Sequence, residues 1–151
     1  MSKAKTLRIS EKAILVIAVL ALALCLSACS GGSKKLSAEE LKVYRELSWE
    51  GTELTVKLGE NKSTGCNWDN EFGDDSIIDY SINRKFTLSD NAALKGQSAG
   101  ILSAGFEGKS AGTTTITFTT PCDWDGKEPG YTYVVTVEVA SDGTIVSATG
   151  E

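Results

Sequence analysis

The sequence contains no histidine among its 151 residues. Many serine and cysteine catalytic sites depend on a histidine base, and many metal sites depend on imidazole ligands. Without histidine, only carboxylates, lysines and bare thiols remain as groups for catalysis. We therefore predict that the protein is not an enzyme and that it needs no cofactor and no metal ion.

The sequence also has little apolar length for a membrane span. The apolar run over residues 13–26 has 14 residues, whereas a spanning helix needs about 20. The run follows a basic start and ends in Leu-Ser-Ala before Cys29, which resembles a bacterial lipobox, in which the cysteine is lipidated and becomes the new N-terminus. We interpret residues 1–28 as a cleaved lipoprotein signal peptide. The alternative is a buried core helix, which the order of these features disfavours.

Positive charge is scarce once the signal segment is removed. That segment holds four of the 15 basic and one of the 20 acidic residues, so 11 and 19 remain and the net charge is about −8. Nucleic acids and anionic lipid surfaces bind basic clusters, so we expect neither as a partner. We expect an extracytoplasmic monomer that is held to the bacterial membrane only by acyl chains on Cys29.

Residues 29–48 contain the lipidated cysteine, a Gly/Ser tether and a segment of undecided structure. Ser37 and Glu40 have the spacing of a capping box, but the segment is compatible with a short helix or with a first strand. Residues 49–151 show β patterns with Gly- and Asp-rich turns, and Asp142-Gly143 predicts a hairpin. We expect an all-β, Ig-like antiparallel β-sandwich. The predicted strands are residues 54–58, 76–82, 85–88, 101–107, 113–120, 131–139 and 144–146.

Two cysteines remain in the mature chain, Cys66 and Cys122. An even pair in an oxidising compartment is compatible with a disulfide and also with two free thiols. Three loops are candidates for binding, since binding residues concentrate on loops that a rigid sheet supports. They are the first loop (residues 61–68), the second loop (residues 95–100) and the third loop (residues 120–126).

The residues of these loops resemble those of the chagasin family of papain-like cysteine protease inhibitors. The first loop, with Ser63-Thr64-Gly65 and Trp68, is similar to the family's Asn-Pro-Thr-Thr-Gly-aromatic motif followed by tryptophan. Gly96 to Gly100 falls where the family has a Gly-x-Gly-Gly loop, and Pro121 to Trp124 falls where it has Arg-Pro-Trp. The resemblance covers about residues 50–140.

The departures from these motifs involve both cysteines. Lys62 replaces the proline, Cys66 replaces the aromatic residue, Thr120 replaces the arginine, and Cys122 lies near the tryptophan. In the family the first and third loops lie side by side, so the resemblance implies a Cys66–Cys122 disulfide that ties them together. Such a bridge needs Cα atoms within about 7 Å of each other.

The resemblance implies a lipid-anchored inhibitor that inserts its three loops into the cleft of a papain-like protease without being cleaved. We expect Trp68 in the core and Trp124 exposed, as an interface anchor. The alternative function is a non-inhibitory Ig-like envelope module that binds a cell-surface or cell-wall partner. The residues expected to contact the protease are Asn61, Ser63, Thr64, Gly65, Gly96, Gly100, Pro121 and Trp124.

Acidic residues gather after the first loop, over residues 69–79. Carboxylates can bind calcium, but the spacing does not fit an EF-hand. We therefore expect a solvated acidic loop there.

Overall fold

The computed structural model describes residues 35–81, 84–91, 94 and 96–151. They belong to one compact unit that begins at Lys35. A short helix precedes the strands, and the 3-10 turn η1 (Lys62–Thr64) follows the second strand. The elements in chain order are α2 (Ala38–Lys42), β1 (Arg45–Glu50), β2 (Glu53–Asn61), η1, β3 (Asp69–Phe72), β4 (Ile78–Tyr80), β5 (Lys85–Leu88), β6 (Ala99–Gly108), β7 (Gly112–Thr120), β8 (Tyr131–Val139) and β9 (Ile145–Gly150).

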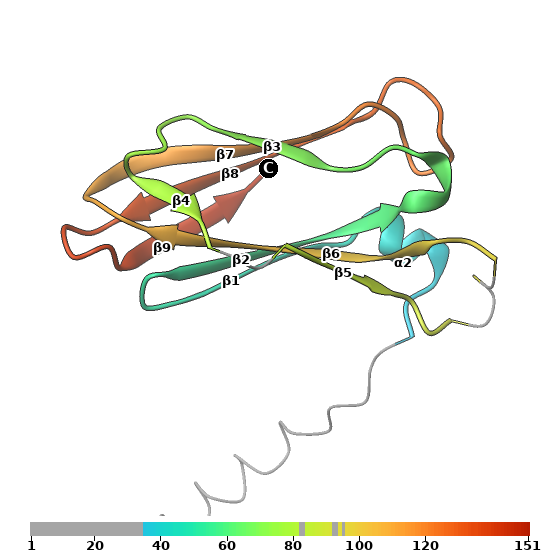
Figure 1. Ribbon diagram of the computed structural model, residues 1–151, viewed down its shortest axis with the longest axis horizontal. Helices are drawn as coiled ribbons and strands as arrows, with labels where there is room; N and C mark the ends of the chain where they lie inside the picture. Colours follow the sequence, from blue (N-terminus) through green and yellow to red (C-terminus); the bar gives the residue numbers. More distant parts are fainter. Residues whose placement is uncertain (1–34, 82–83, 92–93, 95) are drawn as a thin grey trace, which may run out of the picture. The chain divides into compact units, whose positions relative to one another are not determined.

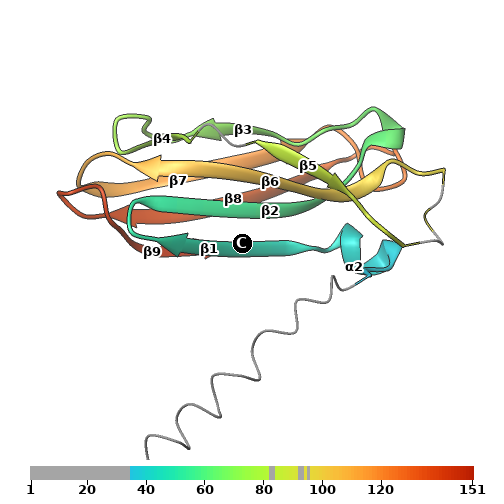
Figure 2. The ribbon, with the colours of Figure 1, turned by 60° about the horizontal axis from the view of Figure 1, so that its bottom comes forward.

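The strands form two antiparallel sheets that face each other (Figure 1). One sheet has the order β1-β2-β6-β4, with β5 also paired to β6, and the other has the order β3-β7-β8-β9. Figure 2 shows β2 and β6 side by side over most of their length. The predicted all-β sandwich is confirmed.

The core lies between the two sheets and follows the period-two pattern of the strands. In β2 the side chains of Leu54, Val56 and Leu58 are fully buried, while the residues between them are partly exposed. Successive side chains of a strand point to opposite faces, so this alternation directs one face inward. From the other sheet, the fully buried residues Ile116, Phe118, Val135 and Val137 complete the interior.

The predicted strands agree with the structure over most of the domain. Residues 85–88 and 131–139 form β5 and β8 with the predicted bounds, and the other predicted strands overlap β2, β4, β6, β7 and β9. Ile82, at the end of one predicted strand, lies outside the described residues. Residues 29–48, for which a short helix or a first strand was expected, contain the helix α2 and, after two intervening residues, the start of the strand β1.

Residues 69–72 differ from the prediction of a solvated acidic loop. They form β3, which pairs with β7 from Asp69 opposite Thr119 to Phe72 opposite Ile116. Asn70 is buried and Phe72 is half-buried, whereas Asp69 and Glu71 are exposed. The acidic side chains therefore form the outer face of an edge strand. The described part of the chain contains no helix long and apolar enough to cross a membrane.

Candidate functional site

The first, second and third loops lie at one end of the sandwich, which we call the loop end (Figure 1, right). The first loop joins β2 to β3, the second leads into β6, and the third joins β7 to β8. Lys95, the first residue of the second loop, lies outside the described residues. The antiparallel pairing of β2 with β6 brings Asn61 opposite Ala99, so the first two loops meet where these strands end.

The first loop is a tight turn held by its own polar groups. The Asn61 side chain accepts a hydrogen bond from the Ser63 amide at 3.2 Å, and the Thr64 hydroxyl donates to the Asn61 carbonyl at 2.8 Å. Gly65 ends η1 with φ of 78°, a left-handed conformation that favours glycine. Ser63 and Gly65 are exposed at the tip of this turn.

Two hydrogen bonds of opposite direction join the first loop to the second. The Lys62 amide donates to the Ser98 carbonyl at 2.8 Å. The Ser98 amide donates to Ser63 Oγ at 2.6 Å. The second loop is thereby fixed against the tip of the first.

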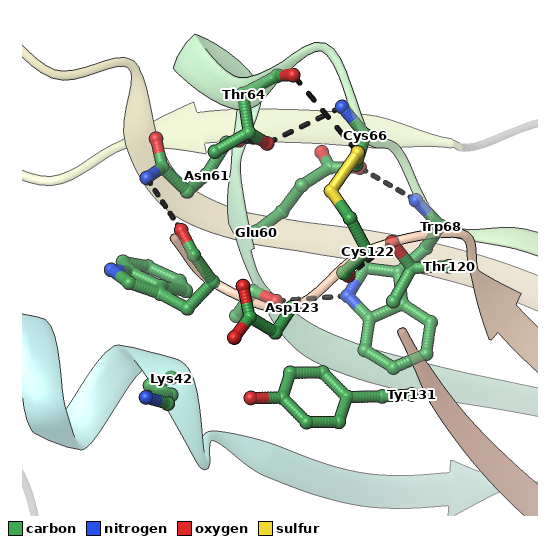
Figure 3. Close-up of a pocket in the computed structure, with 12 residues that line it drawn as sticks. Lys42, Glu60, Asn61, Thr64, Cys66, Trp68, Thr120, Cys122, Asp123 and Tyr131 are labelled. Atoms are coloured by element: carbon green, nitrogen blue, oxygen red, sulfur yellow. Dashed lines mark hydrogen bonds between the residues drawn. A yellow bond between two sulfur atoms is a disulfide. The ribbon is translucent and has the colours of Figure 1, made fainter. Parts of the chain in front are cut away.

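A disulfide and a hydrogen bond join the first loop to the third (Figure 3). Cys66 and Cys122 are bonded, with their Cα atoms 5.9 Å apart, so the implied disulfide is confirmed. The Asn61 Nδ2 group donates to the Trp124 carbonyl at 3.0 Å. The first loop is thus the central loop and is connected to both of its neighbours.

The base of the first loop is buried around Trp68. The Trp68 Nε1 group donates to the Gly59 carbonyl at 2.9 Å, and its amide donates to Glu60 Oε1 at 3.0 Å. The Arg45 guanidinium lies 4.9 Å from the Trp68 ring centre, and burial lowers its pKa. Trp68 is only 4% exposed, so its predicted place in the core is confirmed.

The third loop closes on the carboxylate of Asp123, which was not among the predicted contact residues. Asp123 Oδ1 accepts hydrogen bonds from the amides of Asp125 at 2.9 Å and Lys127 at 2.8 Å. The bond from Lys127 is the main cause of the lowered pKa of Asp123. An aspartate that accepts bonds from amides two and four residues later is typical of a turn, and this motif was the available sequence signal.

Residues 49–138, more than half of the chain, match the sequence model described as chagasin family peptidase inhibitor I42. The chain belongs to the chagasin family. Searches of curated proteins and of solved structures found no match to the chain. The predicted resemblance is thereby confirmed, and membership of the chagasin family implies inhibition of cysteine proteases.

The matched region of this chagasin-family chain holds all three loops, and the structure sorts the predicted contact residues by exposure. Ser63, Gly65, Gly96 and Pro121 are exposed, and Asn61 and Thr64 are partly exposed. Gly100 is a buried residue of β6, and a Cβ atom there would lie 2.1 Å from the Thr87 carbonyl oxygen. Gly100 therefore allows β5 to approach β6, and its main chain lies below the surface of the loop end.

The expectation that Trp124 is exposed is wrong. Its side chain is 9% exposed and packs in a second apolar cluster, separate from the main core. Part of this cluster comes from residues that precede the matched region, and part comes from residues of the second loop and beside it. The buried members of the cluster are Leu36, Leu41, Leu94, Ala99 and Trp124.

Helix α2 provides this cover and is itself fixed at both ends. Ser37 caps it through the predicted capping box, accepting a bond from the Glu40 amide at 3.2 Å while Glu40 accepts one from the Ser37 amide. After the helix, the Tyr44 carbonyl accepts a bond from the Gly59 amide at 3.0 Å. A Cβ atom on Gly59 would lie 1.6 Å from the Leu41 carbonyl oxygen, so glycine is needed for α2 to lie on β2.

The loop end has little enclosed space beneath the disulfide. The hollow beneath the disulfide, drawn in Figure 3, has a volume of about 20 Å³, which is room for about one water molecule. In the described residues, no group of three or more Cys, Asp or Glu side chains is placed to hold a metal ion. The arrangement supports recognition of a partner by three loops that are bonded to one another.

Proposed function

We propose that this chain inhibits papain-like cysteine proteases by inserting the loop end into the active-site cleft. The observation that carries this proposal is the central position of the first loop, which is bonded to the second loop on one side and to the third on the other. An exposed tip on a fixed base loses little conformational freedom when it docks. The exposed residues Ser63 and Gly65 would lie across the catalytic cysteine.

The same hydrogen bonds explain how the first loop would resist cleavage. The carbonyl of Asn61 accepts a bond from the Thr64 hydroxyl, and the carbonyl of Lys62 accepts one from the Gly65 amide at 3.2 Å. Both bonds hold the chain in a turn. A protease binds its substrate as an extended segment, so the turn would have to open before a peptide bond could be attacked.

The third loop would contribute its polar rim to the contact. Trp124 is covered by α2, whereas Pro121, Asp125 and Gly126 are exposed. The wall of the cleft would therefore meet the turn that Asp123 organises. Contact with the Trp124 ring would require displacement of α2.

The test is a titration of papain with the full-length chain in detergent, once with the Cys66–Cys122 disulfide intact and once after this disulfide has been reduced. Tight, reversible inhibition that weakens on reduction supports both loop insertion and the role of the disulfide. Inhibition that is equally tight with and without reductant would support loop insertion and would show that inhibition does not depend on the disulfide. A folded, oxidised chain that inhibits none of several papain-like proteases would instead favour the non-inhibitory envelope module.

We further propose that acyl chains on Cys29 anchor the protein to the extracytoplasmic face of a bacterial membrane. The support is the lipobox-like sequence and the acidic charge of the rest of the chain, which gives it little electrostatic attraction to anionic lipid. A Cys29→Ala variant should lose incorporation of labelled palmitate and should leave the membrane fraction. Retention of the label by this variant would refute the anchor.

A further inference from the structure

Lys62 makes a main-chain bond that a proline at this position could not make. Its amide donates to the Ser98 carbonyl at 2.8 Å, and proline has no amide hydrogen. The returning bond from the Ser98 amide to Ser63 Oγ completes the pair that joins the first two loops. The substitution of lysine for the proline of the family motif therefore adds a connection between the two loops.

The side chain of Lys62 extends from the first loop toward β5. Its ammonium nitrogen lies 4.4 Å from the centre of the Phe86 ring, within the range of a cation–π interaction. Phe86 is paired with Leu102 across β5 and β6, so its position is set by the sheet. The lysine thus connects the central loop to a fixed part of the sandwich.

The same ammonium group lies beside a buried carboxylate. Glu60, the residue before Asn61, is 3% exposed, and its Oε1 atom accepts the bond from the Trp68 amide. Its Oε2 atom has no hydrogen-bond partner among the described residues and lies 3.9 Å from the Lys62 ammonium. Burial of a carboxylate is unfavourable unless a partner compensates it, and the Lys62 ammonium is placed to do so.

We propose that Lys62 and Glu60 are positioning residues for inhibition. With Phe86 and Ser98 they form what we call the lysine clamp: the Lys62 amide bonds the first loop to the second, and the Lys62 side chain holds the first loop against β5 and against Glu60 of β2. The inference rests on the proposed inhibitory function. A loop held from both sides spends more of its time in the docking arrangement, and apparent affinity scales with that fraction.

The main test compares Lys62→Ala with Lys62→Arg in the full-length chain. If the first loop of the alanine variant occupies its docking arrangement for only about a tenth of the time, this variant inhibits papain about tenfold more weakly than the wild type. Lys62→Arg retains a cation for Phe86 and Glu60 and should stay within about twofold of the wild type. Equal inhibition by wild type and Lys62→Ala would overturn the proposal.

Lys109→Ala is the matched control. Lys109 is also an exposed lysine, and it pairs with Asp79 at 3.1 Å far from the three loops. It should inhibit as the wild type does. If Lys109→Ala weakened inhibition as much as Lys62→Ala, the effect would reflect net charge and the clamp would be refuted.

Amide hydrogen exchange tests the clamp without a protease. The Ser98 amide should exchange faster in Lys62→Ala than in the wild type, because the first loop no longer holds its Ser63 acceptor in place. If the wild type fails to inhibit papain, the proposed function fails, whereas faster exchange would still support the clamp. Unchanged exchange in Lys62→Ala would refute the clamp whatever the result of the inhibition assay.

A double-mutant cycle tests the pair of charges. Glu60→Gln retains an oxygen that can accept the bond from the Trp68 amide, and Lys62→Met retains an unbranched side chain of similar length. Lys62→Met should weaken inhibition more when Glu60 is present than in the Glu60→Gln background, because only the carboxylate needs compensation. If the effects of Glu60→Gln and Lys62→Met on inhibition were additive, Glu60 would not be part of the lysine clamp.

Discussion

The two ends of the sandwich are held together by different kinds of contact. At the end opposite the loop end, which we call the turn end (Figure 1, left), main-chain groups bond directly across short turns. The Gly108 amide donates to the Thr52 carbonyl at 2.9 Å, and the Ile145 amide donates to the Gly51 carbonyl at 2.8 Å. At the loop end, one main-chain bond joins Lys62 to Ser98, and the other connections run through the side chains of Asn61 and Ser63 and through the Cys66–Cys122 disulfide.

This difference separates stability from recognition. Main-chain bonds tolerate many side chains, so the turn end depends mainly on turn geometry. Side-chain bonds fail when the residue changes, so the geometry of the loop end depends on the identity of a few residues. Changes at the turn end should therefore alter stability alone, while equal changes at the loop end should alter both stability and inhibition.

The largest expected effect follows removal of the disulfide. The bonded cysteines are 56 residues apart in the sequence, and closing a loop of that size stabilises the fold by about 4 kcal/mol in the chain-entropy model. The double variant Cys66→Ser/Cys122→Ser should lose about this much free energy of unfolding, measured with urea, and should inhibit more weakly. Full inhibition by the folded double variant would show that the first and third loops are held without the covalent bond.

Leu41→Ala should have the next largest effect. Leu41 of α2 is 1% exposed and belongs to the same apolar cluster as Trp124, and removal of such a side chain costs about 3 kcal/mol. Trp124 should become exposed, so in a Trp49→Phe background the summed emission of Trp68 and Trp124 should shift to longer wavelength. Fluorescence measures the exposure of Trp124, and urea unfolding measures the loss of free energy of unfolding.

Ile145→Ala at the turn end is the comparison for Leu41→Ala. Ile145 is 4% exposed and belongs to the main core. It should lose a similar free energy of unfolding, with no change in Trp124 emission and none in inhibition. A shift in Trp124 emission in this variant would show that the two apolar clusters are coupled.

A pair of glycines gives the closest comparison between the ends. Gly65 at the loop end and Gly51 at the turn end have φ of 78° and 58°, and a Cβ atom on either would meet no described residue within 4 Å. Alanine at each position should therefore cost about 1 kcal/mol through the backbone conformation alone. Only Gly65→Ala should also weaken inhibition. Equal inhibition by the two variants would contradict a central role for the first loop.

The smallest expected effect is a loss of stability at high pH. The hydrogen bond between the Tyr44 hydroxyl and Glu46 raises the pKa of Tyr44 to about 12. Because the pKa of Tyr44 is higher in the folded state, the stabilisation of the fold by this hydrogen bond is complete below pH 10 and is lost as the pH rises toward 12. The contribution of this hydrogen bond to stability should stay below about 1 kcal/mol, because both side chains are partly exposed to solvent.

Urea unfolding of wild type and Tyr44→Phe between pH 9 and about pH 12 measures this contribution. The difference between the two proteins should shrink as the pH rises. A constant difference would mean that the bond to Glu46 does not influence the titration of Tyr44.

Much of the fold could be predicted from local patterns. The alternation in β2 and the run of β-branched residues in β7 each indicate a strand, because one face of each strand has to be buried. Asp142-Gly143 indicated the final hairpin, and the Ser37–Glu40 spacing indicated the helix cap. Strand β3 was missed because two of its four residues are acidic and its inward residues, Asn70 and Phe72, carry little signal.

The candidate site was predictable in part. The motif of the first loop and the positions of the two cysteines were visible in the sequence, and the structure brings them together. Trp124 was misjudged because its acidic and glycine neighbours suggest exposure, while the residues that cover it are distant in sequence. Leu36 and Leu41 precede it by more than 80 positions, and no local pattern links them to it.

By itself, the sequence determined most of the strands, the buried Trp68 and the membership of the chagasin family, because each depends on residue patterns that can be read along the chain. The tertiary structure decided which groups meet at the loop end. Lys62 lies over Phe86 because β2 and β5 both pair with β6, and α2 meets Trp124 because the two sheets pack face to face. Contacts between distant segments depend on sheet register, and register is set by the packing of the whole core.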